Sequence, residues 1–275
     1  MPPLPLLCPV RHCHSLLTRG ERSWTCPRGH SFDVARSGYC NLLQPQDRRS
    51  RQPGDSREAA EARRRLFAAG HSEPLLREIL GLLEDLPAGA AVLDVGCGEG
   101  SMLGGVARER PVEAHGIDIS VPSIELAARA FPAATWIVGN ADRFLPYGDG
   151  AFAAVMSLTA RLHPAEMRRV LAPDGRLVVA VAGPDDLIEL REALLGEGVT
   201  RDRLERAAVE LAGLFELAER RSVRHTAQLD PAGVGDVLAS SYRGARESER
   251  RRLEELSGMA VTFSREIGVF RVHLA

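Results

Sequence analysis

The chain has 275 residues, 44% of them hydrophobic, and its 35 basic and 37 acidic residues leave a formal net charge of −2. This length suits one α/β domain with a small additional module, and the apolar content is enough to fill its core. No run approaches about 18 uninterrupted apolar residues and no charged-then-apolar leader is present, so the sequence predicts no membrane span and no secretory signal, and we expect a cytoplasmic protein.

The basic residues are concentrated at the front of the chain. All of them are arginines, and residues 1–70 carry 12 arginines against 6 acidic residues, whereas residues 71–275 carry 23 against 31. A basic module attached to an acidic catalytic domain is the pattern expected when the module docks a polyanion and the domain does the chemistry. The alternative is a solvated basic surface.

The first 30 residues contain two pairs of potential zinc ligands, Cys8 with Cys13 and Cys26 with His30. Three sulfurs and one nitrogen complete a four-coordinate zinc site, and so short a segment needs such a staple to fold. Cys8, Cys26 and His30 are the expected ligands. Cys13 is the expected fourth because zinc in a ribbon favours thiolate over imidazole, and His12 is the alternative. Free core cysteines are the other interpretation.

The next segment links this module to the rest of the chain. Residues 48–56 are polar and turn-rich, and Asp55 or Ser56 is placed to cap a helix over residues 58–69 that carries Arg63, Arg64 and Arg65 as a positive band. We therefore divide the chain into a zinc-binding ribbon over 1–45, a basic linker and helix over 46–72, and a catalytic domain over 73–275.

A strand that runs into a glycine turn is the central motif. The apolar run over residues 92–95 leads into D-x-G-x-G-x-G, with Asp94, Gly96, Gly98 and Gly100 at its fixed positions. Glycines let the backbone turn tightly and let a ligand lie against the main chain. The spacing differs from the dinucleotide fingerprint G-x-G-x-x-G, and Asp94 is placed to face a cationic or amine-bearing ligand.

Two further strand ends extend this site. Asp118 ends a predicted strand 24 residues after Asp94, where an acid can accept both ribose hydroxyls. A third strand ends at Asn140 and Ala141, whose amides and the Asn140 side chain are suited to an adenine edge. Together the three ends predict a site for S-adenosylmethionine. The alternatives are a glycine turn without a ligand and a nicotinamide site.

Alternating elements follow from the apolar periodicity. Helices are predicted over 71–86, 101–110, 120–130, 166–171, 187–195 and 202–215 and after Pro231, with Met102 and Leu103 near the methionine end of the cofactor. Strands are predicted over 151–158, 176–181, 223–229 and 267–273. His163 is interpreted as a surface histidine before a helix, in preference to a base or a phosphate contact. The charged run over 246–255 is interpreted as a solvated helix face.

Residues 75–183 resemble the class I S-adenosylmethionine-dependent methyltransferases. A narrower resemblance covers most of the chain, because several motifs occur together and in order. They are C-P at 8–9, C-P-x-G-H-S-F-D at 26–33, A-R-x-G-Y-x-N-L-L at 35–43, P-G-D-S at 53–56, A-G-H at 69–71 and D-x-G-C-G-E-G at 94–100. In this combination the chain resembles the bacterial 23S rRNA (guanine-N1)-methyltransferases, a family that includes macrolide-resistance members.

The resemblance implies an α/β fold, with a class I Rossmann-like methyltransferase sheet and a small N-terminal zinc-ribbon domain that assists RNA binding. It implies S-adenosylmethionine as cofactor, 23S rRNA as partner, and N1 of a guanine in a domain II hairpin near the exit tunnel as the target. Ser72 and Asp186 stand where family members commonly have an aromatic residue and a histidine that help hold the cofactor, so both belong to the expected cofactor set.

Some features stay open at the level of sequence. The aromatic-Ala-Pro stretch that the family places after the fourth strand is missing, and the sequence names no catalytic base. A small-molecule methyltransferase and a non-catalytic RNA-binding protein with a degenerate cofactor pocket are the alternative functions. A homodimer is a further option, and the sequence specifies neither the target guanine nor drug resistance.

Overall fold

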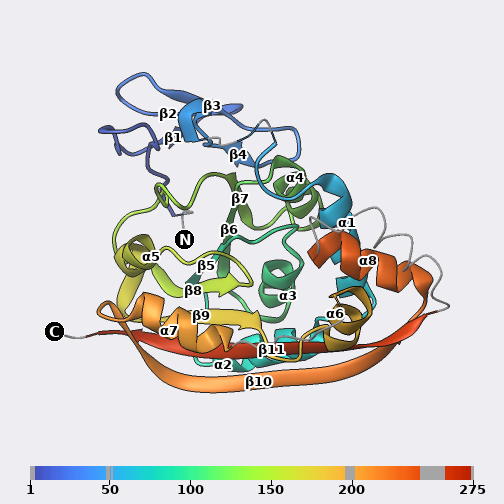
Figure 1. Ribbon diagram of the computed structural model, residues 1–275. Coiled ribbons are helices and arrows are strands. Elements are labelled where there is room, and N and C mark those ends of the chain that lie inside the picture. The colour runs from blue at the N-terminus through green and yellow to red at the C-terminus, as the bar shows by residue number, and fades with distance from the viewer. Residues whose placement is uncertain (1–3, 48–49, 51, 196–201, 242–257, 274–275) are drawn as a thin grey trace.

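A mixed sheet of eight strands forms the centre of the molecule in the computed structural model, which describes residues 4–47, 50, 52–195, 202–241 and 258–273. The strand order is β10-β11-β9-β8-β5-β6-β7-β4, and a separate small sheet has the order β1-β2-β3. Figure 1 shows the small sheet beyond the β7 and β4 edge and a long hairpin along the opposite edge. The run over 246–255, expected to be a helix face, lies outside the described residues.

Parallel strands form the middle of the large sheet. They are β5 (Ala91–Val95), β6 (Glu113–Asp118), β7 (Thr135–Val138), β8 (Phe152–Leu158) and β9 (Leu171–Ala182). In the register, Asp94 is paired with Gly116 on one side and Met156 on the other, and Asp118 is paired with Val138. The carboxyl ends of these strands therefore meet at one edge, the position where open α/β sheets bind ligands.

Crossover helices connect these strands and cover them. They are α3 (Ser101–Glu109), α4 (Val121–Ala130) and α5 (Pro164–Val170). Ser120 caps α4, since its side chain accepts a hydrogen bond from the Ser123 amide. These helices and strands confirm the expected alternation of the α/β fold, with boundaries shifted by a few residues.

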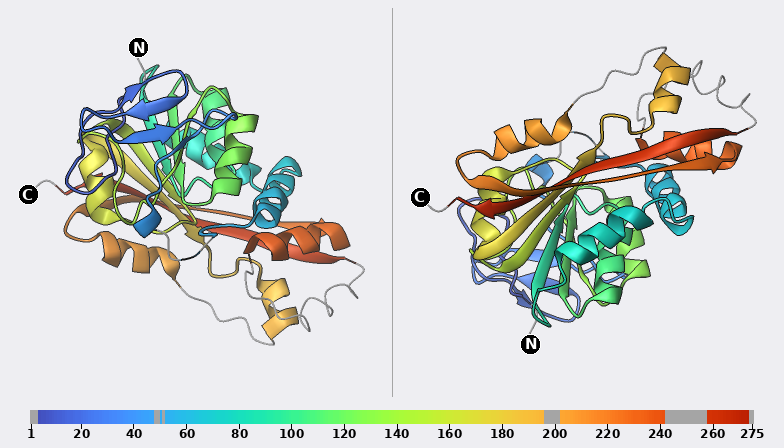
Figure 2. Two further views of the ribbon diagram at one scale, coloured as in Figure 1. Left: turned by 90° about the horizontal axis from the view of Figure 1, so that it is seen from above. Right: turned by 90° about the horizontal axis from the view of Figure 1, so that it is seen from below.

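The opposite edge of the sheet is a long antiparallel hairpin of β10 (Phe215–Leu229) and β11 (Met259–Val272), and β11 pairs antiparallel with β9. Both strands are longer than the stretches expected over 223–229 and 267–273. Figure 2 shows the hairpin running past the parallel strands toward α8 (Pro231–Ser241). The helices α6 (Ile188–Leu195) and α7 (Arg203–Leu211) precede the hairpin in the chain.

Two helices lead from the N-terminal module into the sheet. Ser56 caps α1 (Arg57–Ala68), because its side chain accepts a hydrogen bond from the Ala59 amide at 3.1 Å, and α1 lies against α8. The following helix, α2 (Glu73–Leu82), buries Leu75, Leu76, Ile79 and Leu82. Among the helices that the structure describes, none has both the length and the apolar character needed to cross a bilayer.

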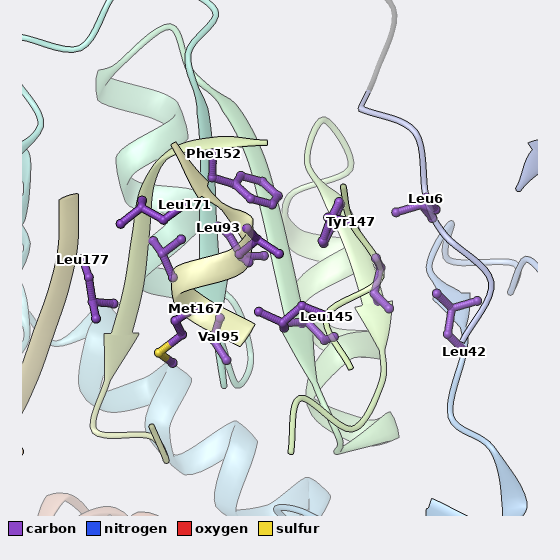
Figure 3. Packing of buried hydrophobic residues seen from close by; sticks show 14 of the residues in the cluster. Leu6, Leu42, Leu93, Val95, Leu145, Tyr147, Phe152, Met167, Leu171 and Leu177 are labelled. Atoms are coloured by element: carbon purple, nitrogen blue, oxygen red, sulfur yellow. The ribbon is translucent and has the colours of Figure 1, made fainter. Parts of the chain in front are cut away.

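The N-terminal module shares its core with the large sheet. Its strands are β1 (Thr18–Arg19), β2 (Ser23–Thr25), β3 (Ser31–Asp33) and β4 (Cys40–Asn41), and a short 3-10 helix, η1 (Pro45–Asp47), follows. Although β4 lies within the segment assigned to the ribbon, it pairs in parallel with β7 of the large sheet. Figure 3 shows Leu6 and Leu42 of the module facing Tyr147 and Leu145, in one apolar cluster with Leu93 of β5. The module is therefore packed onto the catalytic sheet.

Candidate cofactor cleft and metal centre

Three thiols and one imidazole come together in the N-terminal module. The ligand atoms of Cys8, Cys13, Cys26 and His30 all lie within 4.8 Å of one another. His30 Nδ1 is 3.2 Å from Cys26 Sγ and 3.4 Å from Cys8 Sγ, and the Sγ atoms of Cys13 and Cys26 are 3.8 Å apart. A tetrahedral zinc ion with bonds of about 2.3 Å holds its sulfurs roughly 3.8 Å apart, so this donor set fits zinc.

The backbone around these residues forms two tight turns. The Gly29 amide donates to Cys26 O at 2.9 Å, and Gly29 has φ +84°, which brings His30 back to Cys26. His12, the alternative fourth ligand, lies outside the cluster, and its carbonyl oxygen accepts a hydrogen bond from Arg28. The geometry thus places Cys13 beside the other three ligand atoms.

A cleft of about 1070 Å³ opens at the carboxyl ends of the parallel strands, between the glycine turn, α1 and the hairpin. Most of the sequence-predicted cofactor residues line it, namely Ser72, Asp94, Gly96, Gly98, Met102, Asp118, Asn140, Ala141 and Asp186. The structure places two others elsewhere. Leu103 is fully buried in an apolar cluster, and Gly100 faces Trp136 and Ala127.

Each glycine of the turn has a different physical requirement. All three have positive φ, +77° at Gly96, +56° at Gly98 and +79° at Gly100. A Cβ on Gly96 would lie 2.4 Å from Ala160 Cβ, whereas one on Gly100 would lie 2.5 Å from the Trp136 ring. Gly96 therefore brings the loop after β8 against the turn, and Gly100 permits α3 to start against β7.

Asp94 is a buried acid without a hydrogen bond at one oxygen. Its exposed fraction is 2%, and Oδ1 has no partner among the described residues. Burial, together with the nearby charges of Asp118 and Glu99, raises the pKa of Asp94 to about 8. A buried carboxyl in this state is stabilised by a ligand that brings a positive charge or a hydrogen-bond donor. The site thus fits the cationic cofactor predicted from the sequence.

Asp118 is fixed by the turn itself. Its Oδ2 accepts a hydrogen bond from the Gly98 amide at 2.9 Å, and its Oδ1 accepts one from the Ser120 amide at 2.8 Å. Burial raises the pKa of Asp118 against the opposing effect of these amides. A carboxylate has about four acceptor positions, so oxygens held in this way can still accept ribose hydroxyls.

Two predicted residues use their side chains within the protein. The Asn140 side-chain amide donates to Asp47 O at 3.1 Å, and its oxygen accepts from the Asp142 amide at 3.0 Å. Asp186 accepts a hydrogen bond from the Ser264 amide at 2.9 Å and forms an ion pair with Arg265. Ser72 lines the cleft at the start of α2, without a side-chain capping bond.

Comparison with known proteins agrees with this architecture. The zinc-ribbon family model described as RlmA, N-terminal, matches residues 6–51, and the model described as Methyltransferase domain matches residues 92–175. A 23S rRNA (guanine(748)-N(1))-methyltransferase of Streptomyces fradiae is 36% identical over 94% of this chain and 95% of its own length. The chain belongs to the family of 23S rRNA (guanine-N1)-methyltransferases.

Two further comparisons bear on this family member. A relative from Micromonospora griseorubida, provisionally named a 23S rRNA (guanine-N1)-methyltransferase, is 34% identical over 82% of this chain and 81% of its own length. The crystal structure of a provisionally named methyltransferase from Bacillus halodurans has a TM-score of 0.51 and 16% identity, and covers 71% of this chain and 97% of that chain. The latter shows the fold alone. Fold and ribbon together make S-adenosylmethionine and structural zinc the cofactors of this methyltransferase.

Sequence reasoning did not place α1 over the glycine turn of this methyltransferase. Arg63 Nη1 lies 2.8 Å from Asp55 Oδ2 and 3.9 Å from Glu99 Oε2, and all three residues line the cleft. Arg65 forms a two-pronged pair with Asp236 of α8, at 2.6 and 2.9 Å. Two of the three arginines in the expected positive band are therefore engaged by carboxylates. The pair with Asp236 could not be predicted from the sequence, because Asp236 is distant in the chain.

Parallel rings form another wall of the cleft. His71 stacks on Phe263 at 4.9 Å between ring centroids, and His225 stacks on the same ring at 5.2 Å. Burial lowers the pKa of both histidines, so both rings are neutral at pH 7. These residues come from the α1–α2 connection, β11 and β10. Because these segments are far apart in the sequence, no local motif indicates the stack.

The loop after β8 also differs from expectation. His163, expected on the surface, has only 16% of its side chain exposed and lines the cleft. Its Nε2 lies 3.0 Å from Asp142 Oδ1. Thr159, at the start of this loop, has φ +59°, a conformation that is an outlier for a β-branched residue. Such strained positions concentrate at functional sites.

Proposed function

We propose that this chain transfers the methyl group of S-adenosylmethionine to N1 of a guanine in 23S rRNA. The observation that carries the proposal is the presence of both required parts in one packed molecule. They are a cleft at three strand ends, with a buried Asp94 carboxyl group whose Oδ1 has no partner in the described chain, and a zinc-ligand cluster in a basic module. The identity to the Streptomyces fradiae enzyme over 94% of the chain supports the same substrate class.

In this proposal each cofactor-binding residue has a distinct task. Asp94 faces the positively charged part of the cofactor, and Asp118 accepts the ribose hydroxyls. Gly96 and Gly98 let the ligand lie against the main chain. The backbone at Asn140 and Ala141 borders the adenine, while Met102, Ser72 and Asp186 complete the walls. In the ribbon, Cys8, Cys13, Cys26 and His30 hold structural zinc.

The chemistry follows from what each group supplies. S-adenosylmethionine supplies an electrophilic methyl group, and the protein contributes mainly position and electrostatic environment. Guanine presents N1 on its Watson–Crick edge, so the target base must be flipped out or already unpaired in a loop. A domain II hairpin near the exit tunnel is the target that this proposal names.

The ribbon is the part proposed to grip the RNA. Its arginines at positions 11, 19, 22, 28 and 36 are all exposed. Phosphate contacts of this kind position a nucleic acid without reading its sequence. We retain the division into a ribbon over 1–45, a basic linker and helix over 46–72, and a catalytic domain over 73–275 as a division of tasks. A ribosomal substrate places the enzyme in the cytoplasm.

Primer extension on 23S rRNA tests the proposed function. RNA from a host that expresses the gene should give a reverse-transcriptase stop in the domain II hairpin, because a methyl group on N1 blocks base pairing. RNA from the same host without the gene should read through. Read-through in both would contradict the proposal. A homodimer, the remaining expectation, predicts twice the 29.8 kDa chain mass in light scattering.

A further inference from the structure

A histidine–aspartate pair lies in the wall of the cofactor cleft. His163 Nε2 is 3.0 Å from Asp142 Oδ1, and both residues line the same cleft as Gly96 and Asp118. Because Asp142 accepts from Nε2–H, neutral His163 carries its lone pair on Nδ1. Of the cleft histidines in the described chain, His71 and His225 are held by ring stacking, and His163 is paired with a carboxylate.

The loop that carries His163 is anchored beside the glycine turn. Ala160 packs so closely on Gly96 that a Cβ on Gly96 would lie 2.4 Å from it. His163 comes three positions after Ala160, and three residues reach at most about 11 Å even when extended. At its other side, His163 is fixed by α5, since its carbonyl oxygen accepts from the Met167 amide at 2.9 Å. The His163 side chain is thus held in the wall of the cleft, on a loop that is anchored beside the glycine turn.

We propose that His163 is the general base of the methyl transfer and that Asp142 positions its ring. This inference rests on the proposed function. Guanine N1 carries a proton, which must leave as the new bond forms. N1 bonds to the methyl carbon, the carbon–sulfur bond breaks with its electron pair left on sulfur, and the N1 proton moves to Nδ1 of His163. The imidazolium that forms is stabilised by Asp142 and later releases the proton to water.

Burial keeps His163 in the basic form at neutral pH. Burial lowers its pKa, and Arg161 acts in the same direction. Asp142, Glu210 and Glu166 oppose this effect, yet the net shift is downward. A base with a lowered pKa is unprotonated at pH 7 and still strong enough to share a proton in the transition state.

The test is a pH–rate comparison on the full-length, zinc-loaded protein with 23S rRNA and S-adenosylmethionine. His163→Gln should lower kcat at pH 7 by about 100-fold or more, within the range of general-base catalysis, and should leave the dissociation constant of S-adenosylmethionine within about twofold. The deficit should shrink at high pH as guanine N1 itself ionises. Asp142→Asn should lower kcat about tenfold and displace the pH limb. His273→Gln, an exposed histidine, is the matched control and should leave kcat unchanged.

A second variant separates catalysis from folding. His163→Gly with added imidazole should regain activity in proportion to imidazole base, a response that a structural role would not produce. A constant deficit at every pH without imidazole rescue, or wild-type kcat in His163→Gln, would overturn the inference while leaving N1 methylation by the wild type intact. If the wild-type protein itself formed no N1-methylguanine, the proposed function would fail, and the role of His163 with it.

Discussion

At the scale of single residues, the buried carboxyl group of Asp94 is suited to a positively charged ligand. Its carboxyl group is buried, its Oδ1 has no partner in the described chain, and its pKa rises from 3.8 to about 8. In the cofactor-free fold the carboxyl is therefore protonated at pH 6, whereas in the unfolded chain it is ionised. Neutral Asp94 makes its full contribution to the free energy of unfolding below pH 3.8. As the pH rises toward 8, this contribution falls by about 1.4 kcal/mol per pH unit.

A cationic cofactor should reverse this balance, because it stabilises the ionised form. We predict that the affinity of the wild type for S-adenosylmethionine rises from pH 6 to pH 8 by up to about tenfold per unit. Asp94→Asn should remove that part of the dependence and weaken binding at pH 8 by roughly 10-fold or more. Calorimetric titration at several pH values measures both. Asp118 and Glu99, which also face Asp94, are unchanged in the variant.

The same substitution gives an opposite result for stability. Without cofactor, Asp94→Asn should unfold at a higher temperature than the wild type, and the gap should widen from pH 6 to pH 8. Asp174→Asn, at an exposed position, is the control and should show no such widening. A gap that is constant with pH would contradict the raised pKa of Asp94.

Single residues also mark the limit of sequence reasoning about the site. Asp94 and Gly96 were predictable because a strand that runs into a glycine turn commonly binds a nucleotide-like cofactor, and Asp118 because it ends the next strand. Leu103 was assigned because it follows the motif closely, but successive side chains of a helix are turned by about 100°, and Leu103 points into the core. His163 was missed because its partner, Asp142, comes from another loop.

Secondary-structure elements also differ in how well the sequence predicts them. The parallel strands and crossover helices were predictable, since strands buried on both faces appear as apolar runs. The hairpin β10–β11 was predicted too short. Residues 216–220 of β10 are all exposed, and their sequence Glu-Leu-Ala-Glu-Arg does not alternate regularly between apolar and polar residues, so its first half carries no clear strand pattern. Those residues are strand because β11 pairs with them along the whole length.

The ribbon strands are elements that cannot stand alone. β1, β2 and β3 have only two or three residues each, too few to bury a core of their own. We predict that zinc removal by a chelator melts this module and that added zinc restores it. Zinc sites contribute about 10–16 kcal/mol, so the loss of one of four ligands weakens binding by roughly 3 kcal/mol, or about 100-fold.

Metal analysis of two matched variants tests this prediction. Cys26→Ser should lose zinc during purification and lower the unfolding temperature, whereas His12→Gln should keep wild-type zinc, because His12 lies outside the cluster. Equal zinc loss in both variants would contradict the ligand set. An intact protein without zinc would contradict the metal site as a whole.

At the scale of the whole molecule, the ribbon and the cleft hold a fixed relation. β4 extends the large sheet beside β7, and Leu6 and Leu42 of the ribbon share an apolar cluster with Leu93 at the centre of the sheet. RNA held by the ribbon is therefore presented at a set distance from the cleft. Positive charge that could bind RNA is concentrated in residues 1–70, which contain 12 arginines. Of these, Arg63 and Arg65 are already paired with carboxylates. The exposed arginines of the ribbon remain available for the proposed phosphate contacts.

These arginines should control RNA affinity without touching cofactor binding. Neutralising Arg11, Arg22 and Arg28 together with glutamine should reduce affinity for a 23S rRNA hairpin and lower the slope of log affinity against log salt by about 2 to 3, since each lost phosphate contact removes roughly 0.7 to 0.9. Filter binding across a salt series measures this slope, and calorimetry should find the S-adenosylmethionine affinity unchanged. The control neutralises three exposed arginines of the catalytic domain, Arg77, Arg108 and Arg129. If both triple variants lowered the slope equally, the RNA would be held by general charge, and the ribbon would have no special part in docking it.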